Sequence, residues 1–143
     1  MQISVILENK GPSVATITRD ASVAVAVAEM ARLNVGALVV SSDGRAVEGI
    51  ISERDVTRAL GSLGGALLEK PVAAIMTTEV RTVSPNDEVE SLAIMMTEHR
   101  LRHFPVLKDG ALAGIVSIGD VVKSRIEELE QDREALYKYI EAR

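Results

Sequence analysis

Apolar side chains recur along the chain with two different spacings, and their alternation predicts short strands separated by helices. Over residues 21–34 they recur every three or four positions, which indicates an amphipathic helix. A continuous apolar run over 36–41 predicts a buried strand, and the Asp43-Gly44 turn after it predicts a hairpin. The first half is therefore expected to form strand, helix, strand, strand and helix, over residues 14–18, 21–34, 36–41, 47–51 and 52–60.

The same pattern occurs a second time, about 66 residues further along the chain. Matched pairs include Val14 with Val80, Thr16 with Thr82, Met30 with Met96, and Gly49 with Gly114. The second set of elements is expected over residues 80–83, 88–99, 103–107 and 112–116, with a last helix from Ser117 onward. A duplication this regular indicates two copies of one structural unit.

A single copy of about 60 residues buries little apolar surface and would be only marginally stable alone, so the copies are expected to pack on each other. We predict an α+β fold in which two β-α-β-β-α repeats pack sheet against sheet around a pseudo-two-fold axis. Such packing leaves a cleft between the copies, where small ligands commonly bind. The expected segments are an N-terminal strand or entry segment at 1–13, repeat one at 14–66, a folded connector at 67–79, repeat two at 80–125 and a long amphipathic C-terminal helix at 126–143.

The composition narrows the class of protein without identifying a ligand. The chain has 143 residues, a net charge of −5 and 47% hydrophobic residues, which is typical of a folded globular chain and excludes general disorder. The acidic balance argues against nucleic-acid binding. The absence of cysteine excludes disulfides and thiol chemistry. No signal peptide or membrane-spanning apolar run is evident, so we expect a cytoplasmic protein without a membrane partner.

One short motif closes each repeat at the same point, GIISERD over 49–55 and GIVSIGD over 114–120. In both copies the glycine and two apolar residues end a strand, and the serine then begins a helix. One interpretation is a capping box, in which the serine hydroxyl and the aspartate carboxylate accept hydrogen bonds from backbone N–H groups. The other is a ligand site, since a helix N-terminus suits a phosphate and a nearby aspartate can accept ribose hydroxyls. Recurrence at equivalent positions favours the ligand site.

Together these motifs resemble tandem CBS domains, the paired regulatory repeats also called a Bateman module. The resemblance rests on the two glycine-to-aspartate motifs, on VAAIMT at 72–77, on HFPV at 103–106 and on GIVSIGDVV at 114–122, and it covers roughly residues 10–125. It implies a binding module and not an enzyme, for adenosine nucleotides such as AMP, ADP, ATP, S-adenosylmethionine or NAD(H) in two related cleft sites. Such a module would change shape with its ligand and act on a regulated partner protein, which the sequence does not identify.

The resemblance also implies roles for individual residues. The expected ribose and phosphate contacts are Asp55, Asp120, Ser52 and Ser117. The expected adenine contacts are Thr16, Ile17, Thr82 and Val83, with Ala37, Leu38, Phe104 and Pro105 around the base and Met76 in the segment before repeat two. The expected phosphate arm is Arg102 and His103, with Arg54 and Lys10; Arg102 could instead be the solvated end of a strand. Repeat one has no charged counterpart of the basic stretch at 99–103, so the two sites should differ.

The last helix carries an apolar seam that needs a surface to cover it. Ile126, Leu129, Leu136 and Ile140 recur with heptad-like spacing, which Arg133 interrupts. The seam predicts a homodimer, because a long amphipathic helix has to bury its apolar side. The alternative is a helix that folds back on its own domain.

The main hypothesis is therefore a stand-alone sensor of adenine nucleotides, and two alternatives stay open beside it. The chain could be a structural dimerisation protein whose capping boxes bind nothing. It could also be a detached regulatory insert of an enzyme such as IMP dehydrogenase. His99 and His103 do not indicate catalysis or a metal site, because two ligands without a third do not make one.

Overall fold

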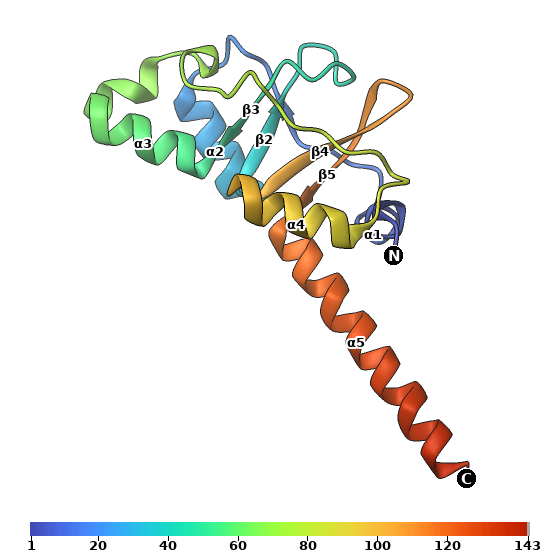
Figure 1. Cartoon of the computed structure of the whole chain (residues 1–143). Helices are drawn as coiled ribbons and strands as arrows, with labels where there is room; N and C mark the ends of the chain where they lie inside the picture. The colour runs from blue at the N-terminus through green and yellow to red at the C-terminus, as the bar shows by residue number, and fades with distance from the viewer. Residues whose placement is uncertain (143) are drawn as a thin grey trace.

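The computed structural model describes residues 1–142, which form two small sheets and a set of helices (Figure 1). In chain order the elements are α1 (Ile3–Lys10), β1 (Thr16–Ile17), α2 (Val23–Leu33), β2 (Ala37–Val40), β3 (Gly49–Ser52), α3 (Glu53–Leu63), the 3-10 helices η1 (Gly64–Glu69) and η2 (Val72–Ala74), α4 (Val89–His99), β4 (His103–Lys108), β5 (Ala111–Ser117) and α5 (Ile118–Glu141). The predicted α+β fold of two repeats with a long C-terminal helix is confirmed. The repeats differ in the length of their first strand.

Each repeat contributes its own small sheet. Repeat one has the strand order β1-β2-β3, with β1 parallel to β2 and β2 antiparallel to β3. In repeat two β4 and β5 are antiparallel, with His103 opposite Ser117. The strand predicted at 80–83 is reduced to one parallel bridge between Val83 and Val106.

Pro105 explains why the first strand of repeat two is so short. At the equivalent position of repeat one, the Val39 N–H donates to the carbonyl of Ala15 at 3.3 Å. Proline has no N–H, so the corresponding bond to residue 81 cannot form. The two bonds that remain are both made by the backbone of Val83, at 3.0 and 2.8 Å.

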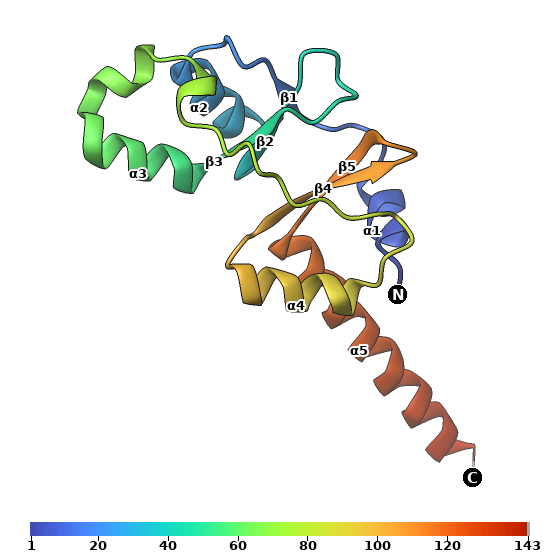
Figure 2. The same cartoon turned by 45° about the horizontal axis from the view of Figure 1, so that its top comes forward.

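Each repeat has its own hydrophobic core, and each core is completed by a segment from outside the repeat. Ile3 and Ile6 of α1 lie in the core of repeat two, although α1 precedes repeat one in the sequence. Val72 of η2, which precedes repeat two, lies in the core of repeat one. Both views of the chain show α1 beside the sheet of repeat two (Figures 1 and 2). The repeats therefore exchange their leading segments, and this exchange ties the two halves together.

The strand predicted within residues 1–13 is wrong, because these residues form helix α1. Ile3 and Ile6 are three residues apart, so a helix places both on the same face, where they are 0% and 6% exposed. The helix is followed by Gly11 with a φ of 86°, a conformation that glycine adopts without steric strain. The boundaries of the predicted segments otherwise stay predictions.

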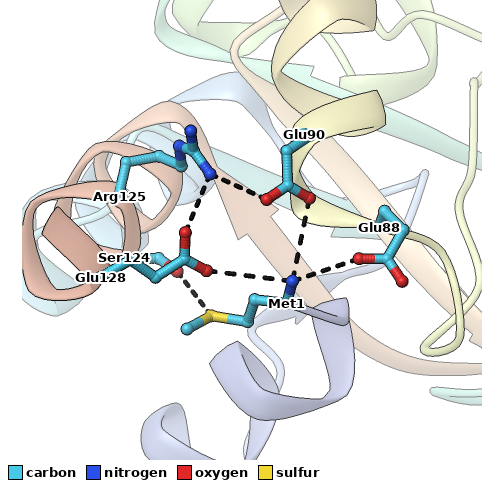
Figure 3. A network of polar contacts seen from close by, with 6 residues as sticks. All are labelled: Met1, Glu88, Glu90, Ser124, Arg125 and Glu128. Atoms are coloured by element: carbon cyan, nitrogen blue, oxygen red, sulfur yellow. Dashed lines mark hydrogen bonds and ion pairs between the residues drawn. The ribbon is translucent and has the colours of Figure 1, made fainter. Parts of the chain in front are cut away.

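A network of charged groups joins the start of the chain to α4 and α5 (Figure 3). The Met1 ammonium lies 3.2 Å from Glu88, 3.8 Å from Glu90 and 3.9 Å from Glu128. Arg125 Nη1 lies 2.8 Å from both Glu90 and Glu128, so one guanidinium connects the two helices. These contacts fix the first half of α5 against α4.

The second half of α5 extends away from the rest of the molecule in both views (Figures 1 and 2). The helix has 24 residues, which corresponds to a length of about 36 Å. Arg133 interrupts the apolar seam of α5. No helix in residues 1–142 combines the length and apolar character needed to cross a membrane.

Candidate functional site

Both copies of the glycine-to-aspartate motif form a complete capping box. Ser52 Oγ accepts a hydrogen bond from the Asp55 N–H at 3.3 Å, and Asp55 Oδ2 accepts one from the Ser52 N–H at 2.9 Å. In repeat two the corresponding distances between Ser117 and Asp120 are 3.2 and 2.8 Å. The capping interpretation is therefore confirmed as geometry in both repeats. The same geometry holds each aspartate at the N-terminus of a helix, where partial positive charge favours anions.

The exchanged helix α1 places a lysine directly on the second of these aspartates. Lys10 Nζ lies 2.8 Å from Asp120 Oδ2 and donates to the Ile115 carbonyl, also at 2.8 Å. Burial alone would raise the pKa of Asp120. The hydrogen bonds from Lys10 and Ser117 outweigh burial, so this pKa lies below its ordinary value. Asp120 therefore stays a carboxylate at neutral pH, with a cation beside it.

The first aspartate has a different neighbour, which comes from the segment before repeat two. Thr77 Oγ1 donates to Asp55 Oδ1 at 3.4 Å. The backbone of Thr77 pairs with Ile50 in both directions, at 3.0 and 2.9 Å. A Cβ on Gly49 would lie 2.9 Å from Met76 Sδ and from the Thr77 carbonyl oxygen, so this segment packs directly on β3. The equivalent glycine of repeat two is packed in the same way, because a Cβ on Gly114 would lie 2.5 Å from Leu7 Cδ2 of α1, so each motif is backed by a segment from outside its own repeat.

A cleft opens beside Asp120, between the two repeats. It has a volume of about 1190 Å³ and is bounded by the second half of α2, by residues 13–16 and by the beginning of α5. Its volume exceeds the roughly 300–1,000 Å³ that is typical of small-molecule sites. Seven of the predicted site residues line it: Lys10, Thr16, Ala37, Arg102, His103, Ser117 and Asp120. The structure thus brings together half of the expected ribose and phosphate contacts in one cavity.

The other predicted site residues do not line this cleft. Ile17, Leu38, Val83, Phe104 and Pro105 are buried, and Leu38 and Phe104 are 0% exposed within the two cores. Their side chains stabilise the repeats, so the base pocket expected around Phe104 is not assembled at the surface. Ser52, Arg54, Asp55, Met76 and Thr82 also lie outside the cleft. Arg54 is exposed, and its Nη1 donates across the repeats to the Arg100 carbonyl at 3.2 Å.

The cleft contains acidic residues that the sequence analysis missed. Glu53 and His103 approach each other across the repeats, because a Cβ on Gly36 would lie 3.4 Å from Glu53 Oε2 and 3.3 Å from His103 Nε2. Burial lowers the pKa of His103, although the charge of Glu53 acts in the opposite direction. The position of Glu53 in the motif is occupied by Ile118 in repeat two, so only the relative placement of the two repeats could have identified Glu53.

The charges along the cleft are nearly balanced. Arg32 forms a salt bridge with Glu29 on α2 at 2.8 Å, and Lys10 forms one with Asp120 at 2.8 Å. Arg102 is exposed at the edge of the cleft and is followed by the half-buried His103. A ligand that carries hydroxyl groups together with a modest negative charge fits such a lining better than a strongly anionic ligand does.

Two duplicated repeats that exchange their leading segments and enclose a cleft at a helix N-terminus define a tandem-repeat module. Comparison with known proteins gives the family. Residues 11–62 and 72–127 each match the CBS domain, so the chain belongs to the CBS-domain family and carries a pair of these domains.

Relatives and solved structures agree with this assignment over almost the whole chain. The mitochondrial CBS domain-containing protein CBSX3 of Arabidopsis thaliana is 40% identical over 147 residues, which cover 97% of this chain and 71% of that protein. A CBS-domain protein of Agrobacterium tumefaciens is 40% identical with a TM-score of 0.84, over 87% of this chain and 99% of that one. A CBS-domain protein of Pyrobaculum aerophilum, solved in complex with AMP, is 30% identical with a TM-score of 0.74, over 84% and 89% of the chains.

Proposed function

We propose that this chain is a regulatory module that binds an adenine nucleotide in the cleft beside Asp120 and signals through a change of shape. The observation that carries the proposal is the Asp120 carboxylate, which is held at the N-terminus of α5 and lines a cavity with room for a nucleotide. Tandem CBS proteins are generally regulatory, and the Pyrobaculum aerophilum relative was solved with AMP.

The geometry suggests how Asp120 and its neighbours would hold a nucleoside. The bonds from Lys10 and from the Ser117 N–H and hydroxyl all reach Asp120 Oδ2, which leaves Oδ1 to accept a ribose hydroxyl. Ser117 and the first N–H groups of α5 lie at the same end of the cleft, where a phosphate is favoured. Lys10 and Arg102 supply cationic groups for the phosphate, and Thr16 lies on the wall formed by repeat one.

We further propose that each chain binds one nucleotide. Ser117 and Asp120 line the cleft, whereas their counterparts Ser52 and Asp55 do not. This arrangement departs from two equivalent sites and agrees with the expectation that the repeats differ. The cytoplasmic location, the lack of enzymatic activity and the identity of the nucleotide stay predictions.

The first prediction compares two matched variants, Asp120→Ala and Asp55→Ala, in their response to AMP. Each variant removes the aspartate of a capping box, and Asp120→Ala also loses the ion pair with Lys10, so each variant is compared with its own melting temperature without ligand. AMP at millimolar concentration should raise the melting temperature of the wild-type chain and of Asp55→Ala, since binding to the folded state stabilises it. Asp120→Ala should lose this rise. Differential scanning fluorimetry and calorimetric titration measure both effects.

The proposal fails if AMP, ADP, ATP and NADH all leave the melting temperature of the wild-type chain unchanged. A loss of the AMP response in Asp55→Ala equal to that in Asp120→Ala would contradict the assignment to the second site. A chain that ignores all these nucleotides and still dimerises would fit the alternative of a purely structural dimerisation protein.

A further inference from the structure

From Val122 to Ile140, α5 presents an apolar stripe that the rest of the described chain leaves largely exposed. Val122, Ile126, Leu129, Leu136 and Ile140 are each more than half exposed. They lie on a helix that projects from the molecule in both views (Figures 1 and 2). Hydrophobic side chains arranged in this way on a free helix indicate a docking surface. The sequence alone suggested dimerisation here, and the structure allows the partner and its direction to be argued.

The stripe has the residue types of a parallel two-stranded coiled coil. With Ile126 at heptad position a, the a positions are Ile126, Arg133 and Ile140, and the d positions are Val122, Leu129 and Leu136. Isoleucine at a with leucine at d favours two parallel strands, and a single polar residue at an a position sets the register. The repeat therefore points to one partner helix of the same kind.

The charged residues beside the stripe distinguish the two possible directions. In a parallel pair each g residue faces the e residue of the next heptad in the other helix, so Arg125 faces Glu130 of the second copy. Arg133 would lie next to Asp132 of the second copy, which offsets the like charge of the opposing Arg133. In an antiparallel pair Glu130 would face Glu130 and Asp132 would face Asp132. Charge complementarity therefore favours the parallel direction.

The structure also prepares this helix for such a partner. Arg125 donates its hydrogen bonds to Glu90 and Glu128 from Nη1. The other nitrogens of its guanidinium can therefore face a second helix. Those contacts fix the base of α5, so the exposed stripe is held in one direction. The Arg133 guanidinium lies 5.4 Å from the centre of the Tyr137 ring, on the flank of the stripe. A preoriented helix loses less conformational entropy when it associates.

We propose that two copies of this chain associate through α5 as a parallel, in-register two-stranded coiled coil from Val122 to Ile140. This segment spans about 27 Å. The partner is a second copy of this chain, with Leu129 and Leu136 packing against their own equivalents and Arg125 pairing with Glu130 across the interface. The proposal does not depend on the ligand of the cleft.

The chain is free of cysteine, so single cysteines can report the direction directly. In the parallel pair, residues of the same d layer lie side by side, and Leu136→Cys should form a covalent dimer under mild oxidation. Gln131→Cys, on the outer side of the helix, is the matched control and should stay largely uncrosslinked. An antiparallel pair would place position 136 opposite position 126. In that arrangement the double variant Ile126→Cys/Leu136→Cys would form a covalent dimer, and neither single variant would. This crosslinking pattern would overturn the proposal.

Sedimentation measures the association without any crosslink. The wild-type chain should sediment at micromolar concentration with twice its mass of 15.3 kDa. Leu129→Lys/Leu136→Lys should sediment as a monomer with an unchanged circular dichroism melting curve of the body, because both side chains are exposed in the single chain. The control Glu134→Lys, on the outer side, should stay dimeric. A monomeric wild-type chain, or a double lysine variant that remains dimeric, would refute the parallel coiled coil.

Discussion

At the scale of single residues, the informative position is His103, because it lies between groups from both repeats. It starts β4 and lines the cleft, with Glu53 of α3 close to it. Glu53 and Asp120 raise its pKa, whereas Lys10 and Arg102 lower it, and burial is the largest effect. The net result is a pKa below the ordinary histidine value, so the folded chain holds His103 neutral at neutral pH.

This shift predicts how stability depends on pH. Below the ordinary histidine pKa of about 6.5, His103 is protonated in the unfolded chain but stays neutral in the folded chain down to its lowered pKa. The free energy of unfolding should therefore decrease as the pH falls from 7 toward 5. His103→Gln should flatten this part of the profile, whereas the exposed His99→Gln should not. Urea unfolding at a series of pH values measures the effect. An identical decrease in the wild-type chain and in His103→Gln would show that another group is responsible.

At the scale of elements, the ends of α2 and α4 show how equivalent helices can differ in quality. Both end with a residue in the left-handed region, Asn34 with a φ of 54° and Arg100 with a φ of 54°. Asparagine tolerates this conformation through its short polar side chain, but arginine is strained there. The helix α4 is therefore terminated less favourably than α2.

Placing asparagine at the C-terminal end of α4, as at the end of α2, should stabilise the chain. Arg100→Asn should raise the free energy of unfolding by about 0.5–1 kcal/mol, because it relieves part of the left-handed strain. The contact from Arg54 should survive, since Arg54 donates to the backbone carbonyl of residue 100. Chemical unfolding measures the gain, and the reverse change Asn34→Arg should lower the stability of α2. No gain in Arg100→Asn would mean that the arginine side chain contributes a contact that offsets the strain.

Most elements could be predicted because their cause is local. The apolar spacing of α2 and α4, the Asp43 turn and the serine caps of α3 and α5 all act within a few residues. The short helix α1 could not be predicted, since its two buried isoleucines fit a strand or a helix until their partners in repeat two are known. The missing strand at 80–83 could have been anticipated from Pro105, whose lack of an N–H is visible in the sequence.

In the candidate site, too, the contacts between residues close in the sequence could be predicted, and the contacts between the two repeats could not. The pairing of Ser117 with Asp120 follows from their spacing, so the sequence alone indicates it. Phe104 was expected at the ligand because the motif around it is family-like, but its position within β4 places it in the core. The approach of Glu53 to His103 depends on how the two repeats face each other, which no local pattern encodes.

At the scale of the whole molecule, the exchange of leading segments makes each half depend on the other. Ile3 is fully buried in the core of repeat two, and its N–H donates to the Asp87 carbonyl at 2.9 Å. The reciprocal contact is made by Thr77, which precedes repeat two and whose backbone pairs with Ile50 on β3 of repeat one. Damage near the start of the chain should therefore appear in the second repeat.

Ile3→Ala tests this dependence. Removal of the buried side chain should lower the free energy of unfolding by about 2–4 kcal/mol through loss of burial and the cavity left behind. Hydrogen exchange measured by mass spectrometry should show faster exchange in α4, β4 and β5 before any change in α2 or β2. The exposed Val5→Ala in the same helix is the control and should change little. Faster exchange confined to repeat one would contradict the exchanged arrangement.

Because α1 completes a core whose last member is Val121, it is synthesised long before its binding surface exists. At about 5–20 residues per second, a ribosome needs on the order of ten seconds to make the intervening chain. During that interval the isoleucine face of α1 is available to any second repeat in reach, including one on a neighbouring nascent polypeptide. Polysome crowding would then favour entangled products, and slower translation between the repeats would lengthen that exposure.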